Sequence, residues 1–286
     1  MQLEGRRKSS NVEDRRSGGR AVAAGGIGLG GIIIVGLIML LTGQDPSQVL
    51  SYIDDGSMTT QDTGYTASAE DQELFDFASI ILAGTEDVWS AIFKKNGLTY
   101  TPPKLVIFNG SVQSGCGGAT SQSGPFYCSA DQSVYLDLSF FKDMKSQFGT
   151  TGDFAWAYVI AHEVGHHVQY LLGTLNKVNQ QRARTNEKTA NQLSVRLELQ
   201  ADFYAGIWAH YDNKNFHSLE DGDIEEGLRI ASAIGDDRIQ KEAYGRTYPD
   251  AFTHGTSAQR SKWLKKGLSS GDPSLGDTFS PNYNDL

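Results

Sequence analysis

Apolar residues recur at helical spacing over several long stretches of the chain, and this pattern is the strongest structural signal in the sequence. The spacing predicts helices over residues 68–95, 152–173, 190–210, 219–244 and 257–267. The fourth of these regions is interrupted by Gly235-Asp236-Asp237-Arg238, where we expect a kink. Ser68 and Asp71 form a capping signal at the start of the first helix.

Two shorter stretches have the pattern of β-strands. Residues 104–108 (KLVIF) are strand-like and end at an Asn-Gly turn signal. Residues 133–139 alternate between apolar and polar side chains, which predicts a half-exposed strand. This strand is either an edge strand that pairs with an extended peptide or an ordinary hairpin strand. The fold class is therefore α+β and mainly helical, with a small β-sheet.

Residues 21–42 contain no charge over 22 positions, which is long enough to cross a bilayer. Residues 1–20 carry six basic and three acidic side chains, and Asp45, Asp54 and Asp55 follow the apolar run. This asymmetry predicts a single-pass membrane protein with a cytoplasmic N-terminus and with the bulk of the chain in the periplasm or outside the cell. The alternative is a cleaved signal peptide, whose apolar core would be shorter and would end at a small-residue cleavage site.

These features divide the chain into four parts: a cytoplasmic basic N-terminus (1–20), a transmembrane helix (21–42), a linker (43–67) and one domain (68–286).

The apolar run also contains a G-x-G-x-x-G pattern, but it lacks the strand and amphipathic helix of a dinucleotide site. The net charge is −9 for the chain and +3 for its first twenty residues, which leaves −12 on the remainder. An acidic body argues against a nucleic-acid surface.

The helix predicted over residues 152–173 carries the candidate chemistry. His162 and His166 are four residues apart and share one helical face, so they can occupy adjacent corners of a tetrahedral zinc site. Glu163 can reach a metal-bound water and act as the general base. Glu163 and His166 also fit the Glu-x-x-His element of di-iron bundles, but that design needs the element on two helices and the chain has no second copy.

Two carboxylates interrupt the apolar helix predicted over residues 190–210. Glu198 and Asp202 are also four residues apart, and carboxylates do not enter a core unpaired. We expect Glu198 to be the third zinc ligand and Asp202 to accept the second ring N–H of a ligating histidine. The alternative is that the pair forms salt bridges with Arg196 or Lys188.

His254 precedes the last predicted helix. A zinc peptidase benefits from a donor at the oxyanion that forms on the attacked carbonyl, and His254 is the candidate. The alternative is a loop histidine that caps the helix.

Structural interpretations suffice for other polar residues: packing for His167, surface positions for His210 and His217, and a local ion pair of Asp236 and Asp237 with Arg238.

Cys116 and Cys128 are the two cysteines of the chain, and they flank a Gly/Ser-rich loop. An even pair in an exported domain predicts a disulfide, which would contribute about 3 kcal/mol by restricting the unfolded chain. A two-cysteine zinc site is the alternative, but no further ligands lie nearby in the sequence.

The segments HEVGHHVQ, RLELQADFYAG and FTHGTSAQR, together with the opening MQLEGRRKSSNVEDRR, resemble the bacterial neutral zinc metallopeptidase family over nearly the whole chain. The resemblance implies a zincin-like domain with Zn²⁺ on His162, His166 and Glu198 and with Glu163 as the base. The segment 254–260 is similar to the Thr-His-Pro…Arg element of membrane-bound zincins, with Gly255 in place of the proline.

The sequence therefore predicts a membrane-anchored zinc metallopeptidase that hydrolyses peptide bonds outside the cytoplasm through a zinc-activated water. Its partners would be a peptide or protein substrate and the membrane, without nucleic acid, and the sequence carries no signal for the oligomeric state. The alternative is a catalytically silent, zinc-binding scaffold of an envelope complex.

Overall fold

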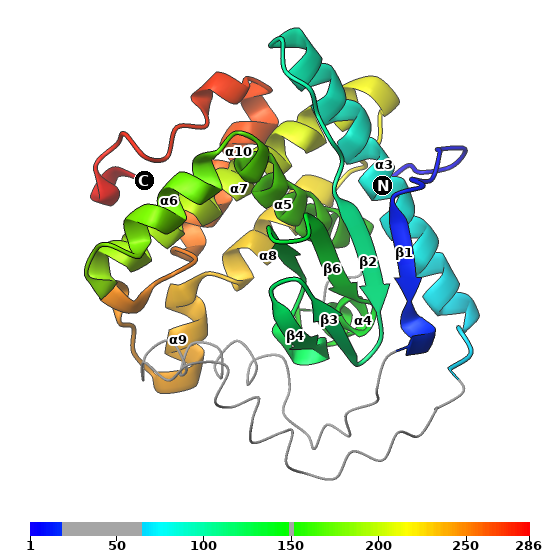
Figure 1. Ribbon diagram of the computed structural model, residues 1–286, viewed down its shortest axis with the longest axis horizontal. Coiled ribbons are helices and arrows are strands. Elements are labelled where there is room, and N and C mark those ends of the chain that lie inside the picture. The colour runs from blue at the N-terminus through cyan, green and yellow to red at the C-terminus, as the bar shows by residue number, and fades with distance from the viewer. Residues whose placement is uncertain (19–64, 149–151) are drawn as a thin grey trace.

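A computed structural model describes residues 1–18, 65–148 and 152–286, and it places a bundle of helices against a small mixed sheet (Figure 1). α3 and α5 pack against the sheet, α7 lies against α5, and α10 lies against α7. The helices are α3 (Ala69–Lys95), α4 (Ser139–Phe148), α5 (Asp153–Leu171), α6 (Thr174–Arg182), α7 (Glu187–Phe216), α8 (Asp223–Ala233), α9 (Asp236–Tyr244) and α10 (Ser257–Ser270). The mainly helical α+β class is confirmed.

Local signals explain where the predicted helices begin and break. The capping box at Ser68 and Asp71 is present at the start of α3. The region 219–244 forms two helices, α8 and α9, rather than one kinked helix. Gly235 lies between them, and a Cβ there would come within 2.3 Å of the backbone nitrogen of Ser257. The break therefore lets the start of α10 approach closely.

The main sheet has the strand order β1-β2-β6-β5, and a separate hairpin joins β3 to β4. β1, β2 and β6 are parallel, whereas β5 runs antiparallel to β6. The strands are β1 (Val12–Arg15), β2 (Lys104–Phe108), β3 (Ser111–Ser114), β4 (Gly117–Thr120), β5 (Phe126–Cys128) and β6 (Ser133–Asp137).

The prediction of a half-exposed strand over residues 133–139 is wrong. β6 lies between β2 and β5, and all five of its residues are buried. Tyr135 stacks on Phe126 with ring centroids 4.9 Å apart, and its hydroxyl donates to Asp131 at 2.7 Å. The face that was expected to meet solvent thus has its own small apolar cluster. The edge-strand interpretation is wrong for the same reason, although β6 does form a hairpin with β5.

The predicted disulfide between Cys116 and Cys128 is confirmed. Cys128 is fully buried in the apolar cluster on the outer face of the sheet, with Val106, Phe108 and Tyr135. The bond therefore ties the loop after β3 to the edge strand β5.

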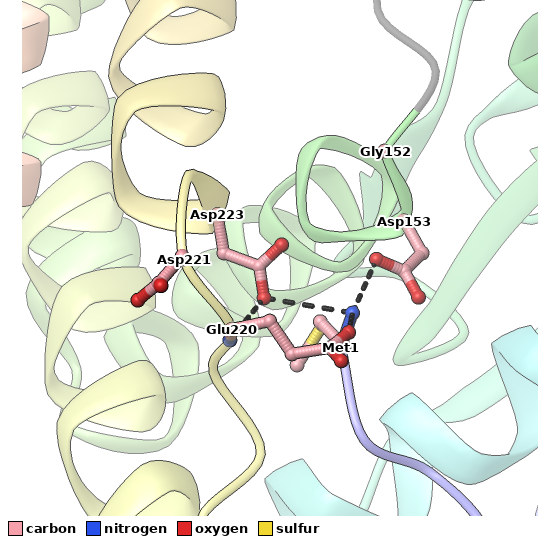
Figure 2. A pocket seen from close by; sticks show the side chains of 6 residues that line it. All are labelled: Met1, Gly152, Asp153, Glu220, Asp221 and Asp223. Carbon is pink, nitrogen blue, oxygen red and sulfur yellow. Dashed lines mark hydrogen bonds and ion pairs between the residues drawn. The ribbon is translucent and has the colours of Figure 1, made fainter.

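The N-terminal segment is an integral part of the domain. β1 forms one edge of the main sheet, where Val12 pairs with Leu105 of β2. The amine of Met1 lies among three carboxylates, 2.7 Å from Asp153, 2.8 Å from Glu220 and 3.5 Å from Asp223 (Figure 2). Burial would lower the pKa of this amine, but its hydrogen bonds to the carboxylates outweigh burial and raise the pKa to about 10.

The predicted localisation is consequently wrong. A segment that supplies a strand of the sheet lies on the same side of any membrane as the rest of the domain, so residues 1–18 are not a cytoplasmic tail of an external domain. Within the described ranges, no helix combines the length and apolarity needed to cross a bilayer. The span predicted at 21–42 and most of the linker predicted at 43–67 lie outside those ranges.

Replacing Arg6 by alanine is expected to destabilise the domain by about 3–5 kcal/mol, because it leaves a buried carboxylate unpaired. Arg6 donates to Asp212 at 2.9 Å, and Asp212 is fully buried on α7. Urea unfolding measures the loss. Lys8→Ala is the control: Lys8 pairs with Asp76 at 2.7 Å but is half exposed, and its loss should cost less than about 1 kcal/mol. Equal, small effects would contradict the packing of the N-terminal segment.

Candidate metal centre

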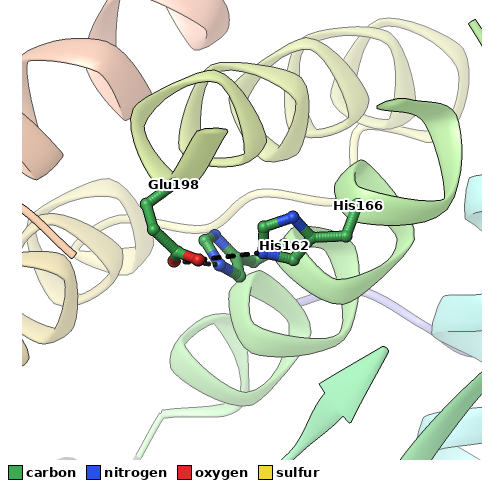
Figure 3. A group of neighbouring side chains, drawn as sticks. All are labelled: His162, His166 and Glu198. Atoms are coloured by element: carbon green, nitrogen blue, oxygen red, sulfur yellow. Dashed lines mark hydrogen bonds and ion pairs between the residues drawn. The ribbon is translucent and has the colours of Figure 1, made fainter. Parts of the chain in front are cut away.

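Helices α5 and α7 meet at an unusually close contact. Gly165 lies inside the His-Glu-Val-Gly-His motif on α5, and a Cβ at this position would come within 3.0 Å of the carbonyl oxygen of Ala201 on α7. The missing side chain lets the two helices approach. This contact brings Glu198 of α7 over the face of α5 that carries His162 and His166 (Figure 3).

His162, His166 and Glu198 form the candidate metal centre. One ligand atom from each lies within 4.8 Å of the others. The Nε2 of His162 is 3.2 Å from one Glu198 oxygen, and the Nε2 of His166 is 3.4 Å from the other. Two ligand atoms of a tetrahedral zinc, each about 2.1 Å from the metal, lie about 3.4 Å apart. The donor types and spacing therefore fit Zn²⁺, as the sequence predicted.

The histidines and carboxylates of the centre shift one another's pKa values. Burial would raise the pKa of Glu198, but the adjacent His166 and His162 rings hold it well below its usual range. Burial would lower the pKa of His162, yet Asp202 and Glu198 raise it to about 10, and Glu198 raises the pKa of His166. The carboxylates thus favour the protonated rings, so a metal ion would compete with protons for the same ring nitrogens.

Asp202 contacts the first histidine of the group. Its Oδ1 accepts from Nδ1 of His162 at 2.8 Å and from the hydroxyl of Tyr158 at 2.6 Å. Arg260 of α10 completes the group, with Nε 2.9 Å from Oδ2 and Nη2 2.9 Å from Oδ1. Because Nδ1 of His162 donates to a carboxylate, its Nε2, which faces Glu198 at 3.2 Å, is the ring nitrogen that could bind a metal once it has lost its proton.

The alternative salt bridges of Glu198 and Asp202 are not formed. Arg196 donates to backbone carbonyls of the C-terminal segment, and Lys188 pairs with Asp250 at 3.0 Å. The partner of Asp202 is instead Arg260, which lies 58 residues away in the sequence.

Sequence reasoning missed Tyr158 and Arg260 as parts of the centre, although both carried a usable signal. Arg260 shares a helical face with the buried Trp263, Leu264 and Gly267, an unusual place for a guanidinium without a partner. Tyr158 precedes His162 by four residues and therefore lies on the same face of α5.

Glu163 is buried next to the two histidines. It is 8 % exposed, and burial raises its pKa even though His162 and His166 pull the other way. It is not one of the three residues whose atoms gather at the centre. A buried carboxylate with a raised pKa suits a group that accepts and returns a proton near neutral pH.

His254 is held by a buried aspartate that the sequence had assigned to a local ion pair. Asp236 accepts the backbone N–H groups of Thr253, His254 and Gly255 at 2.7, 2.6 and 3.0 Å. It also lies 3.2 Å from Nδ1 of the His254 ring. Burial lowers the pKa of His254, but Asp236 and Glu198 outweigh it and raise the pKa.

The capping interpretation of His254 is wrong, because Thr256 caps α10 by accepting from the backbone N–H of Gln259. The local ion pair of Asp236 and Asp237 with Arg238 is also wrong. Arg238 pairs with Glu242 at 3.0 Å, and Asp237 accepts from Ser257.

The other histidines have structural positions. His167 is fully buried, lies 2.9 Å from the Tyr127 hydroxyl and donates to the Thr101 carbonyl at 2.7 Å, so its packing role is confirmed. His217 is exposed at the end of α7, as predicted. His210 is partly buried and bonds to the Leu268 carbonyl, so it is not a simple surface residue.

A His-Glu-x-x-His helix thus faces a glutamate from a second helix, and the three side chains could hold a metal ion. The chain belongs to the family described as "Putative neutral zinc metallopeptidase", which matches residues 1–279. It is similar to the uncharacterized protein YpfJ of Escherichia coli K12, at 48% identity over 285 residues, 98% of this chain and 99% of the relative. It is also similar to the uncharacterized protein Rv2575 of Mycobacterium tuberculosis H37Rv, at 42% identity over 257 residues, 84% and 85% of the two chains. No solved structure gives a significant match.

Proposed function

We propose that the protein is a zinc-dependent metallopeptidase that hydrolyses peptide or protein substrates. The observation that carries the proposal is the buried Glu163 beside the group formed by His162, His166 and Glu198. A site that only stores zinc needs no carboxylate beyond Glu198 and Asp202, and burying one is costly unless it has a role. This argument favours catalysis over a silent zinc-binding scaffold.

The residues of the centre would divide the reaction among them. His162, His166 and Glu198 would hold the ion, which supplies a lowered pKa for bound water and polarises the substrate carbonyl. Glu163 would take the proton of the attacking water and pass it to the leaving amine nitrogen. His254, kept in place by Asp236, would donate to the oxyanion that develops on the carbonyl.

Metal removal and return test the proposal. We expect the purified full chain to bind one equivalent of zinc and to cleave members of an unbiased peptide pool. Cleavage should disappear after treatment with a chelator and return with one equivalent of zinc, with the sites identified by mass spectrometry. Stoichiometric zinc without turnover on any peptide or protein pool would instead support the scaffold.

The matched control is His167→Asn, which changes the neighbouring histidine outside the three-residue group. It should retain stoichiometric zinc, whereas His166→Asn should lose it. Equal zinc content in the two variants would contradict the proposed ligand set.

A further inference from the structure

A buried amide lies behind the second histidine of the centre. Gln169 follows His166 by three residues on α5 and is fully buried. Its Oε1 lies 2.9 Å from Nδ1 of His166. The two histidines of the centre therefore have different supports, a carboxylate at His162 and a neutral amide at His166.

The neighbours of Gln169 determine which way its amide points. Its Nε2 donates to the carbonyl oxygen of Leu197 at 2.7 Å and to Oε1 of Gln200 at 3.1 Å, so both amide hydrogens are used. Gln200 in turn donates from Nε2 to the carbonyl oxygen of Gly276 at 2.8 Å. The oxygen of Gln169 is thus the atom left to face His166, and oxygen can only accept. Nδ1 of His166 must then carry the hydrogen.

We propose that Gln169 is a positioning residue for the metal centre, which holds His166 as the Nδ1–H tautomer and leaves its Nε2 lone pair free for the metal. Gln200 and the Gly276 carbonyl extend this support into a relay that ends on the C-terminal segment. The inference rests on the proposed zinc function, because it assigns a role to residues around that same centre.

The direction of the relay explains why amides are used. Each group donates to the next, from His166 through Gln169 and Gln200 to Gly276, and such chains polarise one another in a low-dielectric interior. A carboxylate in place of Gln169 would face the Leu197 carbonyl and the Gln200 oxygen without a hydrogen to donate. It would also add a buried negative charge to a centre that already contains Glu163, Glu198 and Asp202.

Zinc affinity and ring tautomer test the relay directly. We expect Gln169→Leu to weaken zinc binding about 10–100-fold, as is typical for a lost outer-sphere partner, in competition with a chromophoric chelator. Gln200→Leu should weaken it less, because the contact between Gln169 and His166 remains. Gln240→Leu is the matched control: it removes another fully buried amide, on α9, and should leave zinc affinity within twofold.

Histidine ¹⁵N spectra of the zinc-loaded protein provide a second readout. The wild-type protein should show an exchange-protected Nδ1–H signal for His166. We expect this signal to lose its protection in Gln169→Leu and to keep it in Gln240→Leu. A variant that is merely less stable would not move a single ring proton selectively.

The relay is overturned if Gln169→Leu binds zinc within twofold of the wild type, or if its Nδ1–H signal stays protected. If Gln169→Leu does not fold, Gln200→Leu decides, and wild-type zinc affinity in that variant overturns the relay. Neither readout needs turnover. An inactive protein with these effects would reject the peptidase function alone, and an active one without them would reject the relay alone.

Discussion

Replacing Glu163 by glutamine is expected to lower kcat by about 10²–10⁴-fold while zinc remains bound. The amide keeps the shape of the side chain but cannot accept the proton of the attacking water. Zinc should stay at one equivalent, because the three residues grouped at the centre are His162, His166 and Glu198.

The same substitution should not destabilise the fold. Burial raises the pKa of Glu163, so the folded state binds this proton more tightly than the unfolded state. A carboxyl with a raised folded-state pKa lowers stability as pH rises through its unfolded-state and then its folded-state pKa. A neutral isostere removes that cost, so the thermal midpoint at neutral pH should be equal or higher.

Steady-state cleavage of a peptide from the unbiased pool measures the loss, alongside metal analysis of the same sample. Glu73→Gln, an exposed site on α3, is the control and should match the wild type. Full chelator-sensitive activity in Glu163→Gln would remove Glu163 from the mechanism. Substoichiometric zinc would instead make it part of the binding site.

Local rules account for the parts of the centre that the sequence predicted. The spacing of His162 and His166 on α5 and of Glu198 and Asp202 on α7 follows from helical geometry alone. Two carboxylates on a buried helix also need partners, and this need predicted that Glu198 binds the metal and that Asp202 accepts from a histidine. These inferences needed no knowledge of how α5 and α7 pack.

Long-range packing accounts for what the sequence did not show. Asp236 meets the backbone of Thr253, His254 and Gly255 because a loop returns across 17–19 residues, and no local pattern encodes that return. β6 is buried because β2 and β5 flank it and the ring of Phe126 stacks on Tyr135. The basic opening segment looked like a cytoplasmic tail, since only the folded chain reveals β1 beside β2.

The role of Gln169 depends on both local sequence and long-range packing. The sequence places it on the same face as His166, in a helix whose buried residues are otherwise largely apolar. An unpaired amide there was a signal of the same kind as the carboxylates of α7. Its meaning required the positions of Leu197 and Gln200, which fix the direction of its donors.

Replacing Asp202 by alanine is expected to lower the free energy of unfolding by about 3–5 kcal/mol and to weaken zinc binding about 10–100-fold. The first effect arises because Arg260 is 3 % exposed and would be left as a buried, unpaired charge. The second arises because His162 would lose the acceptor that directs its Nε2 to the metal.

A double variant separates the two effects. Arg260→Met in the Asp202→Ala background removes the unpaired guanidinium, so much of the lost stability should return in urea unfolding. Zinc affinity should stay low, because the acceptor for His162 is still absent. If zinc affinity recovers together with stability, Asp202 acts on the centre only through the fold and does not orient His162.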